Sequence, residues 1–401
     1  NELNLNIKND EKEICNFLLG NNINSKSFFS QAYAGHQFGH FTILGDGRAL
    51  MLGEHINKNN NRFDIQLKGS GKTPYSRNGD GKAALGPMIR EYIVSEAMHH
   101  LDIPSTRALA VITTGERVYR EKIEPGAILV RVAKSHIRVG TFQFGSLLEN
   151  RKEFNHLINY TIKRLYPEIQ NNKKKYLLFF NKICELQINL IIKWMKVGFI
   201  HGVMNTDNIN LSGETIDYGP CAFMDSYNPK TVFSSIDKMG RYSFENQSRV
   251  IMWNLARFAE TFLHLIDNDE NTAIKLVEEI LTKNKERFDN SWLCMMSQKL
   301  NIDEKQDNKE IIREFLDLMH VHKLDYTNSF IDLEKNKLDR KIFKDWLKKY
   351  NKKIKKKYIR VNPYIIPRNH IIEKIIRDSY KENFTNLFEL NKVLKKPYNE
   401  S

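Results

Sequence analysis

The chain has 401 residues, of which 41% are hydrophobic and 27% charged, and its formal net charge is +14. This length allows a large core in two domains or in one bilobal unit. The charge favours polyanionic partners such as nucleotides and carries no information about the fold. The cysteines lie far apart without a C-x-x-C pair, which argues against a zinc site, a disulfide framework and an oxidising compartment. They are Cys15, Cys184, Cys221 and Cys294.

The most apolar stretch, residues 176–200, predicts a buried helix. Charged residues interrupt it at four positions, which is not typical of a membrane span. The first residues, "NELNLNIKNDEKE", resemble neither a secretory signal nor a transit peptide. We therefore expect a cytoplasmic protein with no membrane partner. Because the composition is rich in Lys, Asn and Ile, the positive charge by itself does not predict a nucleic-acid partner.

Residues 30–145 carry most of the strand-like patterning. "HFTILGDGRALMLGE" predicts two strands joined by a tight turn at Asp46-Gly47, and "RFDIQLKG" predicts a third strand. A glycine-rich loop follows, "GSGKTPYSRNGDGKAALG". Pro87 then opens a predicted helix, "PMIREYIVSEAMHHL". Two further strands are predicted within "RALAVITTGERVYRE" and "GAILVRVAKSHIRVGTFQF".

The chain after residue 146 is helical in pattern. Apolar residues recur at helical spacing in "KKYLLFFNKICELQINLIIKWMKVGF", "SRVIMWNLARFAETFLHLI", "TAIKLVEEILTK" and "KEIIREFLDLMHV". The predicted fold class is therefore α+β, with a strand-rich lobe over residues 1–145, a helical lobe over residues 146–401 and a cleft between them.

The segment "HGVMNTDNINLSGETID", residues 201–217, contains the residues best suited to chemistry. Asn208 and Asp217 offer the oxygen ligands that Mg²⁺ requires, and Mg²⁺ in turn bridges phosphate oxygens. Asp207 would then be free to accept a proton from an attacking hydroxyl. The alternative is an exposed loop in which Asp and Asn cap turns. On this stretch alone the two interpretations have equal weight.

The upstream segment favours the chemical interpretation. Lys68 ends a predicted strand and Glu91 lies in the next helix, as in a kinase-like lobe that holds a phosphate-directed lysine through an ion pair. Arg48, Arg131 and Arg138 are candidate phosphate clamps, because guanidinium groups match phosphate oxygens. Arg131 and Arg138 are both expected on the last strand. For any single arginine, a solvated surface position is the alternative.

Other motifs in the chain do not support a site. "GSGKT" is not a Walker loop, because Gln66 stands where the pattern needs glycine. His36 and His40 are spaced like metal ligands, but glycines separate them and structural hydrogen bonding is expected instead. The run "KKYNKKIKKKYIR" is interpreted as a solvated helix face, and Cys221 as a core residue.

Long stretches of the chain resemble the selenoprotein O family of protein adenylyltransferases. They include "QAYAGHQFGHFTILGDGRALMLGE", "DIQLKGSGKTPYSRNGDGKAALGPMIREYIVSEAMHH", "VRVAKSHIRVGTFQF" and "HGVMNTDNINLSGETIDYGPCAFMD". The resemblance runs from about residue 30 to the end. It implies a protein-kinase-like fold that binds ATP head-to-tail relative to ordinary kinases. Members transfer AMP to hydroxyl side chains of proteins with Mg²⁺, and bacterial relatives are credited with UMP transfer when Mn²⁺ is present.

The resemblance also implies roles for individual residues. Asp207 matches the proton acceptor, Asn208 and Asp217 match the Mg²⁺ ligands, and Glu91 matches the glutamate that pairs with the lysine. The positions that match nucleotide contacts are Gly45, Gly47, Arg48, Lys68, Asp80, Gly81, Arg131 and Arg138, and Asp217 reaches the nucleotide through the metal. The implied partners are ATP and proteins with Ser, Thr or Tyr acceptors.

The loop differs from that of ordinary kinases, which runs H-R-D-x-x-x-x-N. Here residues 201–208 read H-G-V-M-N-T-D-N, so Val203 stands at the position of the kinase Asp. Asn208 is in place, and Asp217 in "DYG" stands for the Asp of D-F-G. This difference argues against γ-phosphoryl transfer. A kinase, a non-catalytic nucleotide-binding scaffold and a nucleic-acid-binding protein remain the alternative functions.

Overall fold

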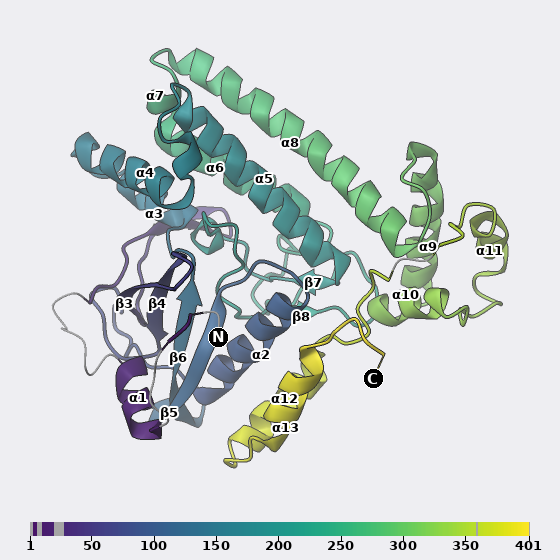
Figure 1. Cartoon of the computed structure of the whole chain (residues 1–401), viewed down its shortest axis with the longest axis horizontal. Coiled ribbons are helices and arrows are strands. Elements are labelled where there is room, and N and C mark those ends of the chain that lie inside the picture. The colour runs from purple at the N-terminus through teal and green to yellow at the C-terminus, as the bar shows by residue number, and fades with distance from the viewer. Residues whose placement is uncertain (1–2, 6–9, 20–27, 358–359, 401) are drawn as a thin grey trace.

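Four antiparallel strands form the main sheet in the order β3-β4-β6-β5 (Figure 1). The strands are β3 (Ala49–Ile56), β4 (Arg62–Lys68), β5 (Arg107–Tyr119) and β6 (Ile123–Ala133). Helix α2 (Leu85–His100) connects β4 to β5. The structure is a computed structural model that describes residues 3–5, 10–19, 28–357 and 360–400. The chain is a mixed α and β protein, as the α+β prediction requires.

The two faces of the sheet have different characters. Gln66 of β4 lies opposite Arg131 of β6 in the register, and Lys68 follows Gln66 by two residues, so these polar side chains share one face. Helix α2 packs on that face. Leu67 and Val130 point to the other face and pack with apolar residues of α1 (Glu11–Leu18). The alternation of the strand sequences therefore separates a charged face from an apolar one.

The predicted hairpin around Asp46-Gly47 is wrong. Strand β2 (His40–Ile43) pairs with β1 (Ala34–Gln37), which precedes it, and not with β3. The connecting residues Phe38 and Gly39 have φ of 51° and 92°, the left-handed conformation that two-residue hairpins favour. The Asp-Gly pair lies instead in the turn that enters β3.

The last predicted strand is too long. Strand β6 ends at Ala133, and Val139–Gly145 form the helix α3, so Arg138 lies at the N-terminus of a helix and not on a strand. The reason is tertiary: Val139 N donates to the carbonyl of Ile209 at 2.9 Å, and a second bond joins the same two segments. Residues 137–139 therefore pair with the segment after Asn208 and leave the sheet.

Helices make up most of the remaining chain, and the four apolar segments predicted as helical are helical. The solvated helix predicted for the basic run at 348–360 is wrong beyond Tyr350, where α11 ends and turns follow. They are α4 (Arg151–Leu165), α5 (Lys175–Lys196), α6 (Gln247–Ala259), α7 (Leu263–Ile266), α8 (Glu270–Lys299), α9 (Lys309–Val321), α10 (Tyr326–Glu334), α11 (Lys344–Tyr350), α12 (Asn369–Ser379) and α13 (Thr385–Leu394), with short 3-10 helices at Pro167–Ile169, Glu260–Phe262 and Gln306–Asn308. Helices α5 and α8 run side by side (Figure 1). Helices α12 and α13 pack against α2, so the end of the chain returns to the sheet. The boundary between two lobes at residue 145 stays a prediction.

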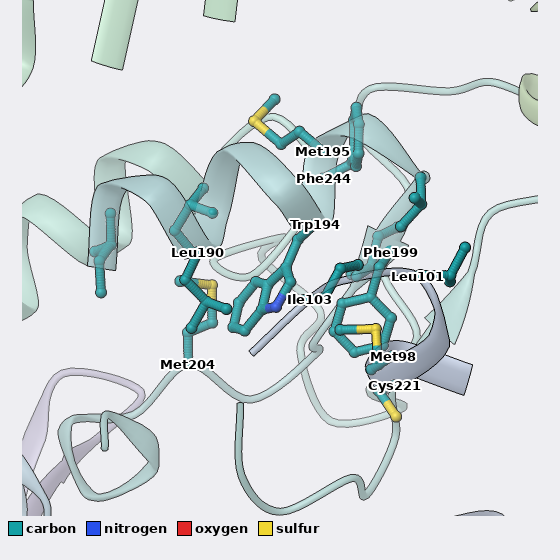
Figure 2. Packing of buried hydrophobic residues seen from close by; sticks show 14 of the residues in the cluster. Met98, Leu101, Ile103, Leu190, Trp194, Met195, Phe199, Met204, Cys221 and Phe244 are labelled. Carbon is teal, nitrogen blue, oxygen red and sulfur yellow. The ribbon is translucent and has the colours of Figure 1, made fainter. Parts of the chain in front are cut away.

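A shared apolar core joins α2, α5 and the segment that follows α5. Figure 2 shows Trp194 of α5 between Met204 and Phe199, with Met98 of α2 and Cys221 nearby. Cys221 is buried, as predicted, and the four cysteines are free. In the described ranges, no helix combines the length and apolar character needed to cross a membrane. Most of the basic run at 348–357 follows α11 as turns, and residues 358–359 lie outside the described part.

Candidate active site

A pair of two-residue strands holds the ends of the loop that carries the predicted catalytic residues. Strand β7 (Phe199–Ile200) pairs with β8 (Ala222–Phe223). Within the loop, His201 is buried and stacked on Trp194, and its Nε2 lies 2.8 Å from the carbonyl oxygen of Ile216. Residues Thr206–Asn208 form a 3-10 turn. Asp207 and Asn208 on one limb and Asp217 on the other are thus held by backbone pairing and by a buried histidine.

Arg138 joins the two limbs of this loop. Its Nη1 donates to the carbonyl oxygen of Asp207 at 3.2 Å and to Asp217 Oδ2 at 3.0 Å. The Arg138 guanidinium lies over the aromatic ring of Tyr33, with 4.9 Å between the guanidinium carbon and the ring centroid. Arg138 Nε is buried and has no hydrogen-bond partner among the described residues. One hydrogen-bond donor of a buried arginine is thus unused beside the loop that carries Asp207 and Asp217.

Five ionised residues from the sheet, α2 and the loop form what we call the charge cluster: Lys68, Glu91, Arg131, Arg138 and Asp217. Lys68 Nζ lies 2.7 Å from Glu91 Oε2 and 2.8 Å from Asp217 Oδ1. Arg131 donates to Glu91 and, at 2.7 Å, to Asp217 Oδ1. The predicted Lys68–Glu91 pair is therefore confirmed. Because burial of unpaired charge is costly, the mutual pairing is what allows so many charges inside.

The pairing fixes the protonation of the two carboxylates. Burial alone would raise the pKa of Glu91, but Arg131 and Lys68 outweigh it and the net pKa is lowered. Burial opposes ionisation of Asp217 in the same way, and Lys68, Arg131 and Arg138 together hold its pKa well below the usual range. Both carboxylates are ionised at neutral pH. Three cations thus converge on Asp217, whose φ of 62° lies in the left-handed region that Asp tolerates better than most residues.

Asp207 has a different environment. Its side chain is buried, and its Oδ1 has no hydrogen-bond partner among the described residues. Burial raises the pKa of Asp207 to about 6, against the opposing effect of Arg138. Gly35 of β1 and Gly140 of α3 lie against it, and a Cβ on either would be crowded by Asp207 atoms. A carboxyl group with this pKa can accept a proton near neutral pH.

Asn208 and Asp217 fit a hard cation by their donor chemistry. Asn208 Nδ2 donates to the carbonyl of Val203 at 2.9 Å, which leaves Oδ1 as the atom that can bind a metal. An amide oxygen and a carboxylate are ligands that Mg²⁺ accepts, and Mg²⁺ commonly completes its shell with phosphate oxygens and water. The described residues contain no group of three His, Cys, Asp or Glu side chains placed for a metal. The predicted site is of another type, with one carboxylate and one amide.

The predicted nucleotide turn connects to the charge cluster through Asp46, which the sequence pattern marks only as a turn residue. Asp46 is buried, lies 3.5 Å from Arg138 and accepts from Gln66 Nε2 at 3.2 Å. Gly45 and Gly47 on either side of it pack against Tyr75 of the glycine-rich loop. Arg48 is exposed, and no polar partner of its side chain is found in the described residues. The glycine-rich loop thus packs against the turn at residues 45–47.

Asp80 and Gly81 lie apart from the charge cluster. Asp80 pairs with Arg120 at 2.9 Å and is exposed enough that the pair is solvated; this pairing lowers the pKa of Asp80 to about 2. Gly81 packs on the backbone of Gly71, with φ of 67°. The structure therefore places these two predicted nucleotide contacts at the base of the glycine-rich loop, where Gly81 pairs with Gly71 and Arg120 holds Asp80.

Residues that sequence reasoning missed complete the site. Gln66 accepts from Arg131 and donates to Asp46, so it bridges the cluster to the nucleotide turn. Its position two residues before Lys68 on a strand was a usable signal. Gly35 and Gly140 carried no such signal, because their role depends on contacts across the fold. His36, as predicted, makes a structural contact: its Nδ1 lies 2.9 Å from Gln143 Nε2.

Comparisons with known proteins identify the family of the chain. Residues 1–344 match the family described as Protein adenylyltransferase SelO. A protein of Pelagibacter ubique named Protein nucleotidyltransferase YdiU is 50% identical over 99% of this chain and 86% of its own length. Proteins of the same name from Clostridium perfringens and Halalkalibacterium halodurans are 50% and 51% identical, each over 93% of this chain, and over 79% and 80% of their own lengths.

The family match covers most of the chain, and the relatives are about 50% identical in sequence over nearly all of it. Together these matches identify the family. The charge cluster, Asp207 and Asn208 lie within the matched region. The chain belongs to the SelO family of protein adenylyltransferases, a family of nucleotide-transferring enzymes.

Proposed function

We propose that this protein transfers AMP from ATP to Ser, Thr or Tyr hydroxyls of other proteins, with Mg²⁺ or Mn²⁺ as the metal. The observation that carries the proposal is the convergence of three buried cations on Asp217, directly beside a buried Asp207 with a raised pKa. The proposal includes a kinase-like bilobal fold in which the triphosphate tail of ATP points into the charge cluster. UMP transfer with Mn²⁺ and a cytoplasmic location are part of it.

In the proposed active site, the charge cluster binds the phosphates of ATP. Asp217 now accepts hydrogen bonds from Lys68, Arg131 and Arg138, all of which are donors that match phosphate oxygens. Arg138 Nε adds a donor for which the described residues supply no partner. A triphosphate tail that binds here shares these donors with Asp217. The outermost phosphates are then held inside, and the α-phosphorus faces the loop that carries Asp207.

Asp207 supplies the proton acceptor. In the proposed step, the acceptor hydroxyl oxygen bonds to the α-phosphorus, the α–β bridging P–O bond breaks, and pyrophosphate leaves. The hydroxyl proton passes to Asp207, whose pKa of about 6 leaves it ionised at pH 7 and basic enough to take that proton. Such proton transfer accelerates a reaction by about 10²–10⁴-fold. When bound, the divalent cation neutralises charge on the phosphates, and Asn208 Oδ1 and Asp217 would hold it.

Val203 favours this proposal over phosphorylation. It stands at the loop position where kinases have their catalytic Asp, and its carbonyl oxygen accepts from Asn208 Nδ2. A hydrocarbon side chain cannot orient a hydroxyl or accept its proton. A kinase activity would therefore need another acceptor at that position. A non-catalytic scaffold is disfavoured because Lys68, Asp207 and Asn208 are all present, and a chain that had lost catalysis would have no need of all three.

Labelled nucleotides test the proposal directly. Incubation of the protein with a heat-inactivated protein extract and α-³²P-ATP should label proteins, whereas γ-³²P-ATP should not, because only AMP transfer retains the α-phosphate. Label from the γ position alone would establish phosphorylation and refute the proposal, and label from neither would favour the scaffold. A structure with a non-hydrolysable ATP analogue then tests the orientation: the γ-phosphate should contact Lys68 and Arg131.

A further inference from the structure

A groove separate from the charge cluster opens between the β1–β2 hairpin and helix α6. We call it the hairpin groove; its volume is about 610 Å³, and its lining includes Phe38, Lys238, Met239, Arg241, Arg249 and Trp253. We propose that the hairpin groove binds an acidic segment of the protein substrate, next to the residue that receives the nucleotide. This inference rests on the proposed function and deepens it, because it names the class of substrate.

The hairpin groove is connected to Asp207 by strand β1. Phe38, the first residue after that strand, donates its backbone N–H to Asn205 Oδ1 at 3.3 Å and to Tyr242 Oη at 3.2 Å. Gly35, three residues earlier, lies against the Asp207 carboxylate. Because a strand rises about 3.3 Å per residue, the groove lies about 10 Å from Asp207 along the strand. An extended substrate covers this distance with about three residues.

The opposite wall is anchored to the same loop. Trp253 of α6 packs edge-on against the His36 ring, with centroids 5.1 Å apart, and the backbone N–H of His36 donates to Thr206 Oγ1 at 2.7 Å. Arg241 lies over the Trp253 ring at 4.7 Å. The groove is therefore built on the residues that immediately precede Asp207. A segment bound there is held in a fixed relation to the proton acceptor.

The charge of the hairpin groove is unbalanced. Lys238 and Arg249 are exposed, and neither forms an ion pair with any described residue. Among the described residues that line the groove, Asp237 alone is acidic; it is buried, and its two oxygens accept from the backbone N–H groups of Arg241 and Tyr242. The Asp237 carboxylate is thus occupied by hydrogen bonds to the backbone of residues 241–242 and is not paired with the described cations of the groove. A ligand with carboxylates would complement the remaining cations.

Exposed apolar side chains favour a protein as the occupant over a nucleic acid. Met239 is 93% exposed and Ile236 is 70% exposed, both beside the unpaired cations, and Phe38 is partly exposed at the hairpin tip. Methionine and aromatic side chains together with arginine are characteristic of protein interfaces. A polyanion that bound through phosphates alone would leave these apolar groups in water. The combination fits an acidic segment that also has an apolar residue.

Peptide binding to the full-length protein tests the proposal without requiring catalysis. The probe is a fluorescent peptide with one Tyr and glutamates three residues on either side; a matched peptide carries lysines instead. The test variant is Lys238→Glu/Arg249→Glu. The control is Lys275→Glu/Lys283→Glu, which reverses two exposed charges on α8; neither residue lines the hairpin groove. Anisotropy titrations at two salt concentrations give the affinities.

The expected result is that the acidic peptide binds the wild type and the control about tenfold more tightly than the test variant, with affinity falling as salt rises. Equal affinity for the wild type and the test variant would overturn the proposal. So would a single-stranded oligonucleotide that binds as tightly and depends on the same two residues. Binding that follows the expected pattern while α-³²P-ATP labels nothing would support the groove and refute the transferase. If the test variant and the wild type label proteins equally and bind the acidic peptide equally, the transferase would be supported and the groove proposal refuted.

Discussion

The backbone of Gly35 lies against the carboxylate of Asp207. A Cβ on Gly35 would overlap Asp207 Oδ1 and would lie 3.0 Å from its Cγ. Only a residue without a side chain leaves this carboxylate in place. The contact links the β1–β2 hairpin to the chemistry of the loop, although some 170 residues separate them in the sequence.

Gly35→Ala should therefore displace Asp207 and reduce nucleotide transfer by about 10²-fold, because small misplacements of a catalytic group cost this much. ATP binding should not change, since the charge cluster is untouched. The combination with Asp207→Ala provides the sharper measurement. If Gly35 acts through Asp207, the double variant should be no slower than Asp207→Ala alone. Additive losses would mean that the alanine disturbs something else.

The rate of transfer should depend on pH through Asp207. Its carboxylate form is the proton acceptor and its pKa is raised to about 6 by burial, so the rate should fall about tenfold per pH unit below 6 and level off above it. Asp207→Ala should lower the plateau by about 10²–10⁴-fold and remove this pH dependence, while the dissociation constant of ATP stays the same. A pH profile of transfer under saturating ATP measures both. A variant that keeps the wild-type rate would exclude Asp207 as the base.

Asp217→Ala should separate metal binding from phosphate binding. Loss of the carboxylate removes a metal ligand, so Mg²⁺ should no longer tighten ATP binding, a loss of at least about 10–100-fold. Binding of ATP without metal should stay the same or become tighter, because Lys68, Arg131 and Arg138 lose an internal competitor. Calorimetric titrations with and without Mg²⁺ give the two values. A Mg²⁺ effect of wild-type size would contradict the ligand role.

Glu91→Gln should destabilise the fold. It removes one of the two carboxylates that neutralise the buried Lys68 and Arg131, and breaking a buried pair costs about 3–5 kcal/mol. Glu116→Gln is the control, since its pair with Lys82 is exposed and such pairs contribute about 0–1 kcal/mol. Urea denaturation followed by circular dichroism measures both free energies of unfolding. Similar losses in the two variants would show that the cluster is not held by its charges.

The local patterns of the sequence determined much of the fold. Alternation in "RFDIQLKG" predicted β4 and put Gln66 and Lys68 on one face, and helical spacing predicted α5, α6 and α9. These features depend on neighbouring residues, whose periodicity is readable from the chain. The Lys68–Glu91 pair could also be predicted from the sequence, because a strand and the helix that follows it commonly pack together.

Only the tertiary structure decided the parts that depend on distant residues. The pairing of 137–139 with 209–211 turned Arg138 away from the sheet and toward Asp207 and Asp217, against the strand pattern of its own segment. The β1–β2 hairpin displaced the predicted Asp-Gly hairpin for a similar reason, since its left-handed turn and its contact with Thr206 outweigh a local turn preference. The sequence by itself determined which charged groups are present. Their arrangement around Asp217 came from packing, because a buried charge is stable only where the whole fold brings its partners to it.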